Sequence, residues 1–158
     1  SMKIVLLVIG KTDESYIETG VSKYIGRLKH YVQFETIVIP DLKNRKSLSE
    51  EQQKRQEGSL ILSQLAQGDN VVLLDEKGRT FSSRGFSQYL EREMNTCCKR
   101  IVFVVGGPYG FSQEVYDKAK SKISLSEMTF SHQMVRLVFV EQLYRAFTII
   151  KGESYHHD

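Results

Sequence analysis

The sequence contains little proline, few cysteines and no long hydrophobic run, and each shortage excludes a class of protein. Only 2 prolines and 11 glycines occur among 158 residues. Such a composition is typical of a globular domain and argues against a disordered chain. The longest apolar runs, residues 4–9 and 101–105, are far shorter than the roughly 20 residues that span a bilayer. We therefore expect no membrane span, and with no signal peptide we expect a cytoplasmic protein.

The two cysteines, Cys97 and Cys98, are adjacent. They lack the spacing of zinc ligands and of redox motifs, so we expect reduced thiols at the boundary of an element and no metal site. The formal net charge is only +3, too small to identify a nucleic-acid partner, although basic residues could gather on one face. Ser1 precedes what looks like the native Met2, so we treat it as an expression remnant and expect one domain over residues 2–158.

Apolar runs rich in β-branched residues alternate with helical patterns along the chain. The strand-like runs cover residues 3–9, 34–39, 71–75, 101–105 and about 123–125, and a turn is expected at 76–78. Helical spacing covers about 15–29, 49–66, 82–94, 112–119 and 134–150. Hairpin signals are absent, which predicts an α/β fold with a largely parallel sheet. Ligands of such sheets bind beyond the carboxyl ends of the strands.

Three loops follow predicted strands and compete for one site: Leu74-Asp75, residues 106–110, and the segment after Leu125. The glycine-rich loop 106–110 lacks both the spacing of the dinucleotide fingerprint and the lysine of a phosphate-binding loop. It is either a ligand-binding loop or a plain strand-to-helix turn. Residues 124–132 are rich in hydroxyls and suit an adenine pocket from which Met128 and Phe130 exclude water. The alternative for this segment is a solvated loop that caps the last helix.

Several polar side chains follow toward the end of the chain. His132 could titrate near neutrality or contact a phosphate, but a lone histidine at a helix start is more often a capping or packing residue. Glu141 and Arg145 fit a routine surface ion pair. Tyr155 and His156 combine a stacking surface with titratable nitrogens. The alternative for them is a disordered end, or a metal site that lacks further ligands of suitable spacing.

Four ordered blocks of this sequence carry a resemblance to a known family. They are Val104-Val105-Gly106-Gly107-Pro108-Tyr109-Gly110; Ser124 to Thr129 with His132 and Val135-Arg136; Glu141 to Ala146; and Tyr155-His156. The chain resembles, essentially from end to end, the ribosomal RNA large subunit methyltransferase H family of the SPOUT superfamily. These enzymes methylate N3 of a pseudouridine in 23S ribosomal RNA.

The resemblance implies properties that the residue pattern alone does not. They are a deep C-terminal trefoil knot, S-adenosylmethionine as methyl donor, a homodimer, and the assembled ribosome as substrate. Carried over by position, the cofactor wall would consist of Leu74, Asp75, Gly106, Gly107, Ser126, Glu127, Met128, Thr129, Phe130 and Ser131. The catalytic neighbourhood would hold His132, Arg145, Tyr155 and His156, with the tail of one subunit near the cofactor of the other.

This resemblance leads to a hypothesis about the chemistry and to one about charge. His156 or an adjacent group would accept the N3 proton while Arg145 stabilises the developing charge. The family commonly has Arg or Lys where this chain has His157; if this position binds an RNA phosphate, RNA affinity here should be weaker and more pH-dependent. Lys43, Arg45, Lys46, Arg136 and Arg145 are candidates for a basic face.

Two other functions compete with this assignment. One is a catalytically inactive, ribosome-associated RNA-binding module of the same fold. The other is an α/β protein that binds a different adenine-containing ligand and has no role in RNA biology.

Overall fold

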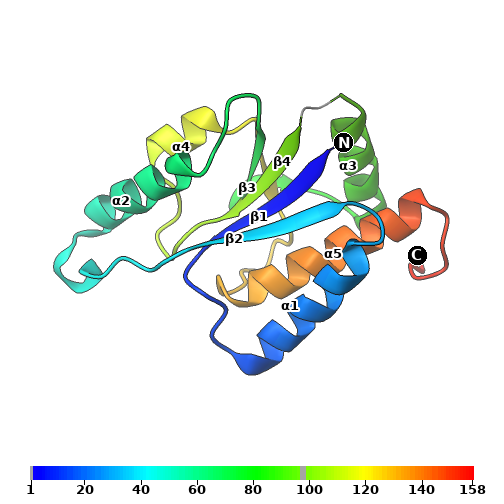
Figure 1. Cartoon of the computed structure of the whole chain (residues 1–158), viewed down its shortest axis with the longest axis horizontal. Helices are drawn as coiled ribbons and strands as arrows, with labels where there is room; N and C mark the ends of the chain where they lie inside the picture. The colour runs from blue at the N-terminus through cyan, green and yellow to red at the C-terminus, as the bar shows by residue number, and fades with distance from the viewer. Residues whose placement is uncertain (1, 97–98) are drawn as a thin grey trace.

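The protein folds around one five-stranded sheet in which every strand pair is parallel, as predicted. The computed structural model describes residues 2–96 and 99–158, so Cys97 and Cys98 lie outside the described residues. The sheet order is β2-β1-β4-β3-β5 (Figure 1). The strands are β1 (Lys3–Ile9), β2 (Gln33–Ile39), β3 (Asn70–Thr80), β4 (Arg100–Val105) and β5 (Ser121–Ser124). The helices are α1 (Ser15–Leu28), η1 (Arg45–Ser47), α2 (Glu50–Ser63), α3 (Ser83–Thr96), α4 (Gln113–Lys118) and α5 (Met134–Ile150).

Helices cover both faces of the sheet, and this explains the unbroken apolar runs. In β1, alternate residues point to opposite faces: Ile4, Leu6 and Val8 join the core under α1, α3 and α5. Val5, Leu7 and Ile9 join the core under α2 and α4. Because neither face meets water, no position of the strand favours a polar side chain. Figure 1 shows α5 beside α1, with α2 and α4 on the other side of the sheet.

Helix α2 is the least apolar of the long helices, and its packing reflects this. It begins with a capping box, in which the Ser49 hydroxyl accepts from the Gln52 N–H and the Gln52 side chain accepts from the Ser49 N–H. Its buried positions are Gln53, Glu57, Gly58 and Ile61. Glu57 and Gly58 therefore face the loop that follows β4 and the start of α4, while Ile61 packs on the sheet.

The turn expected at residues 76–78 is wrong, because β3 continues through them to Thr80. The pairing of β3 with β5 shifts register between Leu74 and Arg79, so the strand bulges without leaving the sheet. Gly78 makes this possible: a Cβ there would lie 2.6 Å from the backbone nitrogen of Ile123. The glycine marks a close approach of two strands.

No helix within residues 2–96 and 99–158 is long and apolar enough to cross a membrane.

Candidate active site

A cavity of about 510 Å³ lies beyond the carboxyl ends of β4 and β5 and beside the middle of β3. Each of the three predicted segments contributes a wall, although Leu74-Asp75 is not a loop but part of β3, which continues to Thr80. Nine of the ten residues predicted for the cofactor wall line this cavity; Glu127 does not. The nine are Leu74, Asp75, Gly106, Gly107, Ser126, Met128, Thr129, Phe130 and Ser131. His132 lines it as well.

The glycine-rich wall is a tight turn backed by a buried acid. Gly107 and Gly110 form an isolated bridge, and Gly110 has a φ of 84°, which favours glycine. Glu57 of α2 lies directly behind this loop, so a Cβ at Gly107 would come within 2.5 Å of Glu57 Oε1. Only a residue without a side chain allows the loop backbone to lie this close.

The Glu57 carboxyl is itself unusual, because only 5% of this residue is exposed. Gln53 Nε2 donates to its Oε2 at 3.1 Å, while its Oε1 has no hydrogen-bond partner among the described residues. Burial raises the pKa of this carboxyl. The sequence analysis missed Glu57; the available signal was an acid beside Gly58 in a helix with almost no apolar stripe.

The β3 wall carries a fixed carboxylate. Asp75 Oδ2 accepts a short hydrogen bond from the Tyr116 hydroxyl, and its Oδ1 accepts from the Lys77 N–H at 2.9 Å. Burial, together with this bond to Asp75, raises the pKa of Tyr116. Tyr116 lines the cavity from α4 and was not predicted. An aromatic residue with a polar tip, one turn into the helix after a glycine-rich loop, was the signal for it.

The third wall, residues 124–132, is held by its own hydroxyls. Ser126 Oγ accepts from the Met128 N–H at 2.9 Å, and Ser131 Oγ accepts from the Met134 N–H at 3.1 Å in the first turn of α5. The segment therefore lines the cavity and also supports the start of the last helix, so the structure contains features of both interpretations. Met128 is 79% exposed and Phe130 36% exposed at the rim.

Arg136 was expected on a basic surface, and this is wrong because the side chain is only 2% exposed. Its guanidinium donates to the Ile9 and Gly10 carbonyls, both at 2.8 Å, and to the His132 carbonyl at 3.1 Å. Burial lowers the pKa of Arg136. Arg136 therefore ties the end of β1 to the segment that enters α5. Of the other four candidates for the basic face, Lys43, Arg45 and Lys46 are exposed on the connector, whereas Arg145 is mostly buried and paired with Glu141.

The other three predicted catalytic residues form a second cluster at the end of α5. Arg145 donates to Glu141 Oε2 at 2.7 Å, and the Tyr155 hydroxyl donates to the same oxygen at 2.7 Å. Arg145 also lies over the Tyr155 ring, and its Nη1 is 3.1 Å from His156 Nδ1. The Glu141–Arg145 pair exists as expected, but both side chains are mostly buried and shared with the tail. Burial and the bonds to Tyr24 and Glu141 raise the pKa of Tyr155.

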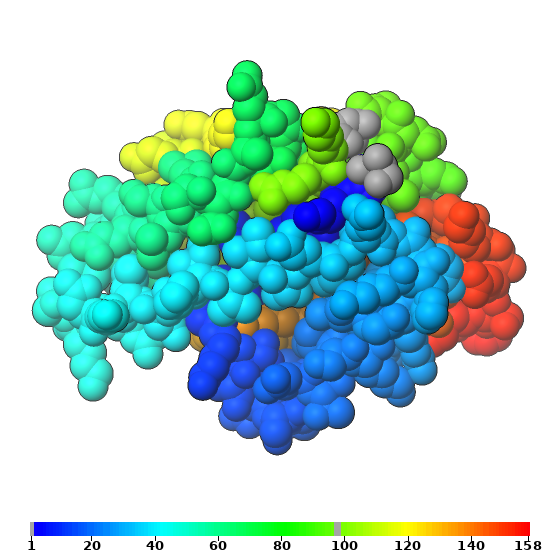
Figure 2. Space-filling view, in the orientation of Figure 1, coloured from blue at the N-terminus to red at the C-terminus, as the bar shows by residue number. Residues whose placement is uncertain are grey.

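The cavity and the tail cluster are separate within one chain. None of Arg145, Tyr155 and His156 lines the cavity. Arg145 lies 13 positions beyond His132, which corresponds to about 20 Å at the helical rise per residue. Figure 2 shows the tail at one end of the molecule and the 41–47 connector at the other. Among the described residues, no group of three or more His, Cys, Asp or Glu is placed to hold a metal ion.

Comparisons with known proteins agree with one another. A family model described as "Predicted SPOUT methyltransferase" matches residues 2–156. The chain is 62% identical over 157 residues to the ribosomal RNA large subunit methyltransferase H of Parabacteroides distasonis, covering 99% of this chain and 100% of that protein. It is also 62% identical to the protein of the same name from Christiangramia forsetii, covering 99% of each chain. The protein of that name from Bacteroides thetaiotaomicron is 57% identical over 157 residues.

Proposed function

Because the chain belongs to the SPOUT methyltransferase family, we propose that it transfers the methyl group of S-adenosylmethionine to N3 of a pseudouridine in 23S ribosomal RNA on the assembled ribosome. The observation that carries the proposal is the three-walled cavity at the strand ends, together with the Arg145–Tyr155–His156 cluster. A protein that only bound RNA would need neither.

The cavity fits S-adenosylmethionine in size and in chemistry. Its volume of about 510 Å³ lies within the range of small-molecule sites. Leu74, Val105 and Ile123 supply apolar surface, while Asp75 supplies a negative charge that suits a cationic ligand. Gly106 and Gly107 leave backbone accessible to the ligand. Ser126 to Ser131 would hold the adenine, and Met128 and Phe130, which are exposed at the rim of a single chain, would exclude water once a partner protomer covers them.

The bound cofactor supplies an electrophilic methyl group on a sulfonium. The chain's own residues must then orient the acceptor and remove its proton. His156 would accept the proton from N3, and the Arg145 guanidinium would stabilise the negative charge that develops on the adjacent carbonyl oxygen. The ring of Tyr155 offers a stacking surface close to both groups. His132, at the mouth of the cavity, would contact a phosphate of the substrate.

We further propose a homodimer in which the tail of one protomer meets the cavity of the other. Support comes from the separation of about 20 Å within one chain and from the exposed apolar rim of Met128, Phe130 and Tyr109. The whole of residues 2–158 would form one domain with the family's trefoil knot. The segment between β5 and α5, which lies against the other two loops in the cavity, would be the threaded part. The substrate proposed here would place the enzyme in the cytoplasm.

Methylation assays on whole ribosomes and on bare 23S RNA test this function. We expect methylation of ribosomes only, and at least a 100-fold loss of single-turnover rate in His156→Ala and in Arg145→Ala, the scale of general acid–base and electrostatic contributions. His30→Ala changes an exposed histidine of the loop after α1 and should leave the rate unchanged. Near wild-type rates in both active-site variants would refute the assignment.

A calorimetric titration with S-adenosylmethionine separates the competing functions in part, and methylation of whole ribosomes compared with bare RNA separates all three. We expect S-adenosylmethionine to bind to the cavity. If the protein is an inactive RNA-binding module, it should associate with ribosomes without methylating them. If it is specific for another adenine-containing ligand, it should neither associate with ribosomes nor methylate them.

A further inference from the structure

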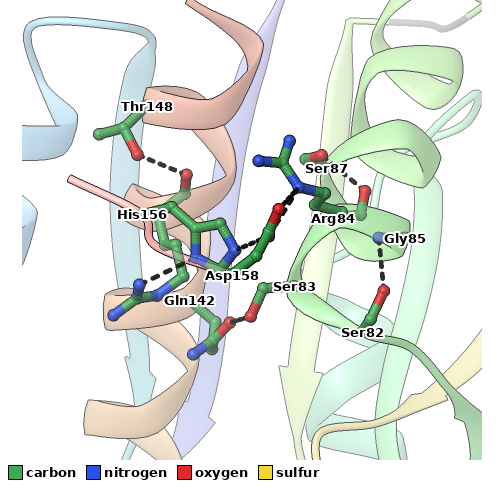
Figure 3. Close-up of polar contacts among 10 residues, drawn as sticks. Ser82, Ser83, Arg84, Gly85, Ser87, Gln142, Thr148, His156 and Asp158 are labelled. Atoms are coloured by element: carbon green, nitrogen blue, oxygen red, sulfur yellow. Dashed lines mark hydrogen bonds and ion pairs between the residues drawn. The ribbon is translucent and has the colours of Figure 1, made fainter. Parts of the chain in front are cut away.

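The tail beyond α5 turns back and places His156 between α5 and α3. Only 12% of the His156 side chain is exposed. On one side its Nδ1 faces Arg145 Nη1 at 3.1 Å, and on the other its Nε2 is 2.9 Å from Asp158 Oδ1. Figure 3 shows Asp158 between His156 and Arg84 of α3. Arg84 Nε lies 2.7 and 2.9 Å from the two Asp158 carboxylate oxygens.

These contacts determine where the imidazole carries its proton. A guanidinium has only donors, so the Nδ1 that faces Arg145 must be the acceptor and hold a lone pair. The proton of the neutral ring is therefore on Nε2, which donates to Asp158. The hydrogen bond from Arg84, followed by the one from His156, lowers the pKa of the Asp158 carboxyl and keeps it a charged acceptor.

The same contacts show that the proposed base is covered. The Nδ1 lone pair, with which His156 would accept a proton, is occupied by an Arg145 N–H. Arg145 also keeps an unused donor, because its Nε is buried without a hydrogen-bond partner among the described residues. A substrate oxygen that drew Arg145 toward itself would satisfy this donor and release the lone pair in one movement.

We propose that Asp158, held by Arg84, is a positioning residue that fixes the Nε2–H form of His156, and that Arg145 masks Nδ1 until a substrate carbonyl oxygen draws Arg145 away. This rests on the proposed function and extends it. When the base is unmasked, the N3 proton moves to Nδ1 and the electron pair of the N–H bond stays on the nucleobase. Arg145 then meets the charge that develops on the carbonyl oxygen, and the Asp158 carboxylate faces the new imidazolium. The other charged group in this cluster is Glu141, which acts through Arg145.

The tautomer can be measured in the free protein without any activity. Two-dimensional nitrogen NMR on ¹⁵N-histidine-labelled protein at pH 8 distinguishes a protonated from an unprotonated ring nitrogen, and the spectrum of His156→Gln assigns the signal. We expect the wild-type ring to be protonated on Nε2 alone, because the Arg145 and Asp158 contacts both favour this form. Asp158→Ala, which keeps the Arg145 contact, should gain a smaller share of the Nδ1–H form than the double variant Arg145→Ala/Asp158→Ala, which has neither contact and should contain both tautomers. Glu91→Ala, which removes an exposed acid of α3, is the control and should leave the spectrum unchanged. A wild-type ring protonated on Nδ1 would overturn the proposal.

Steady-state kinetics then test whether the orientation of His156 by Asp158 matters for turnover. We expect Asp158→Ala to lower kcat about 10-fold, the scale of removing a hydrogen-bond partner that orients a histidine, with KM for ribosomes unchanged. Arg84→Ala should lower kcat less than Asp158→Ala does. The double variant Arg84→Ala/Asp158→Ala should have the same kcat as Asp158→Ala, because Arg84 acts through Asp158. Asp158→Glu should have a higher kcat than Asp158→Ala. Arg92→Ala changes another exposed arginine of α3 and should have no effect.

Two outcomes would count against the positioning role. If Asp158→Ala and Arg84→Ala raised KM alone, these residues would contribute to RNA binding. If kcat were unchanged in both variants, they would have no role in turnover. If the wild-type protein methylates no ribosome, the proposed function fails, while the NMR result still decides how His156 is held.

Discussion

At the scale of single residues, the ion pair of Asp69 and Arg100 is the most enclosed in the fold among the described pairs. Arg100 Nη2 lies 2.7 Å from Asp69 Oδ2, and only 3% of the Asp69 side chain is exposed. Burial alone would raise the pKa of Asp69, but the hydrogen bonds from Arg100 and from the Ala66 N–H outweigh it and lower this pKa. The pair joins the loop before β3 to the first residue of β4.

We predict that Asp69→Asn lowers the free energy of unfolding at pH 7 by about 2 kcal/mol, less than for a fully buried pair because Arg100 remains partly exposed. A carboxyl whose pKa is lowered by folding stabilises the fold above its unfolded pKa, and this contribution disappears as the pH falls through the folded pKa. The difference between variant and wild type should therefore be constant above pH 5 and should shrink below the ordinary Asp value of 3.8. Urea unfolding at several pH values measures it, with Glu91→Gln as the exposed control. A pH-independent difference would contradict the role of the charge.

Arg136 shows what a residue pattern cannot reveal about a side chain. Arg136 lies in the predicted last helix, but two of the backbone carbonyls to which it donates, those of Ile9 and Gly10, are more than 120 positions away in the chain. Charge and local spacing contain no information about such contacts. Glu57 and Tyr116 were missed for the same reason, because the groups that define them come from other elements of the fold.

At the scale of elements, the close approach of β3 and β5 depends on Gly78. We predict that Gly78→Ala costs about 1–3 kcal/mol of stability, because a Cβ 2.6 Å from the Ile123 backbone forces two strands apart. Gly26 lies in α1, and a Cβ added there meets nothing within 4 Å. Gly26→Ala should therefore raise the free energy of unfolding by up to about 1 kcal/mol. Thermal unfolding of both variants measures the contrast. Equal effects of the two changes would contradict this account of the strand contact.

Elements with a strong apolar pattern could be predicted from the sequence. Segments whose structure depends on contact with a distant strand could not. The last helix was predicted at residues 134–150 and spans these residues, because its apolar positions recur with helical spacing. The segment 76–78 has turn residues but stays in β3, because tertiary contact with β5 overrides local preference. The parallel sheet alone predicted the segments that meet at the candidate site, although one of them, Leu74-Asp75, lies within β3. The hydrogen bond from Tyr116 to Asp75 could not be predicted, because it joins residues far apart in the sequence.

At the scale of the whole molecule, the proposed dimer makes a prediction about mixtures. Gly107→Leu should displace the glycine-rich wall of the cavity, because even a Cβ there would meet Glu57 behind the loop at 2.5 Å. His156→Ala should remove the proposed base. If each active site combines one protomer's cavity with its partner's tail, mixed dimers contain one intact site although both parents are inactive.

We expect refolded equimolar mixtures of the two variants to regain about a quarter of wild-type methylation, since half of the dimers are mixed and each has one intact site of two. Sedimentation of the wild type should give twice the chain mass of 18.2 kDa. A mixture that stays inactive, although sedimentation shows mixed dimers, would place the whole site within one chain.

The order of the cavity walls along the chain has a consequence for biosynthesis. The walls come from residues 74–77, 105–111 and 123–135, so a nascent chain has no complete pocket until its last third has been synthesised. A ligand that needs all three walls cannot stabilise earlier intermediates. Binding of the proposed cofactor would therefore stabilise only chains whose last third has been synthesised, and the sheet would assemble without it from its own apolar residues.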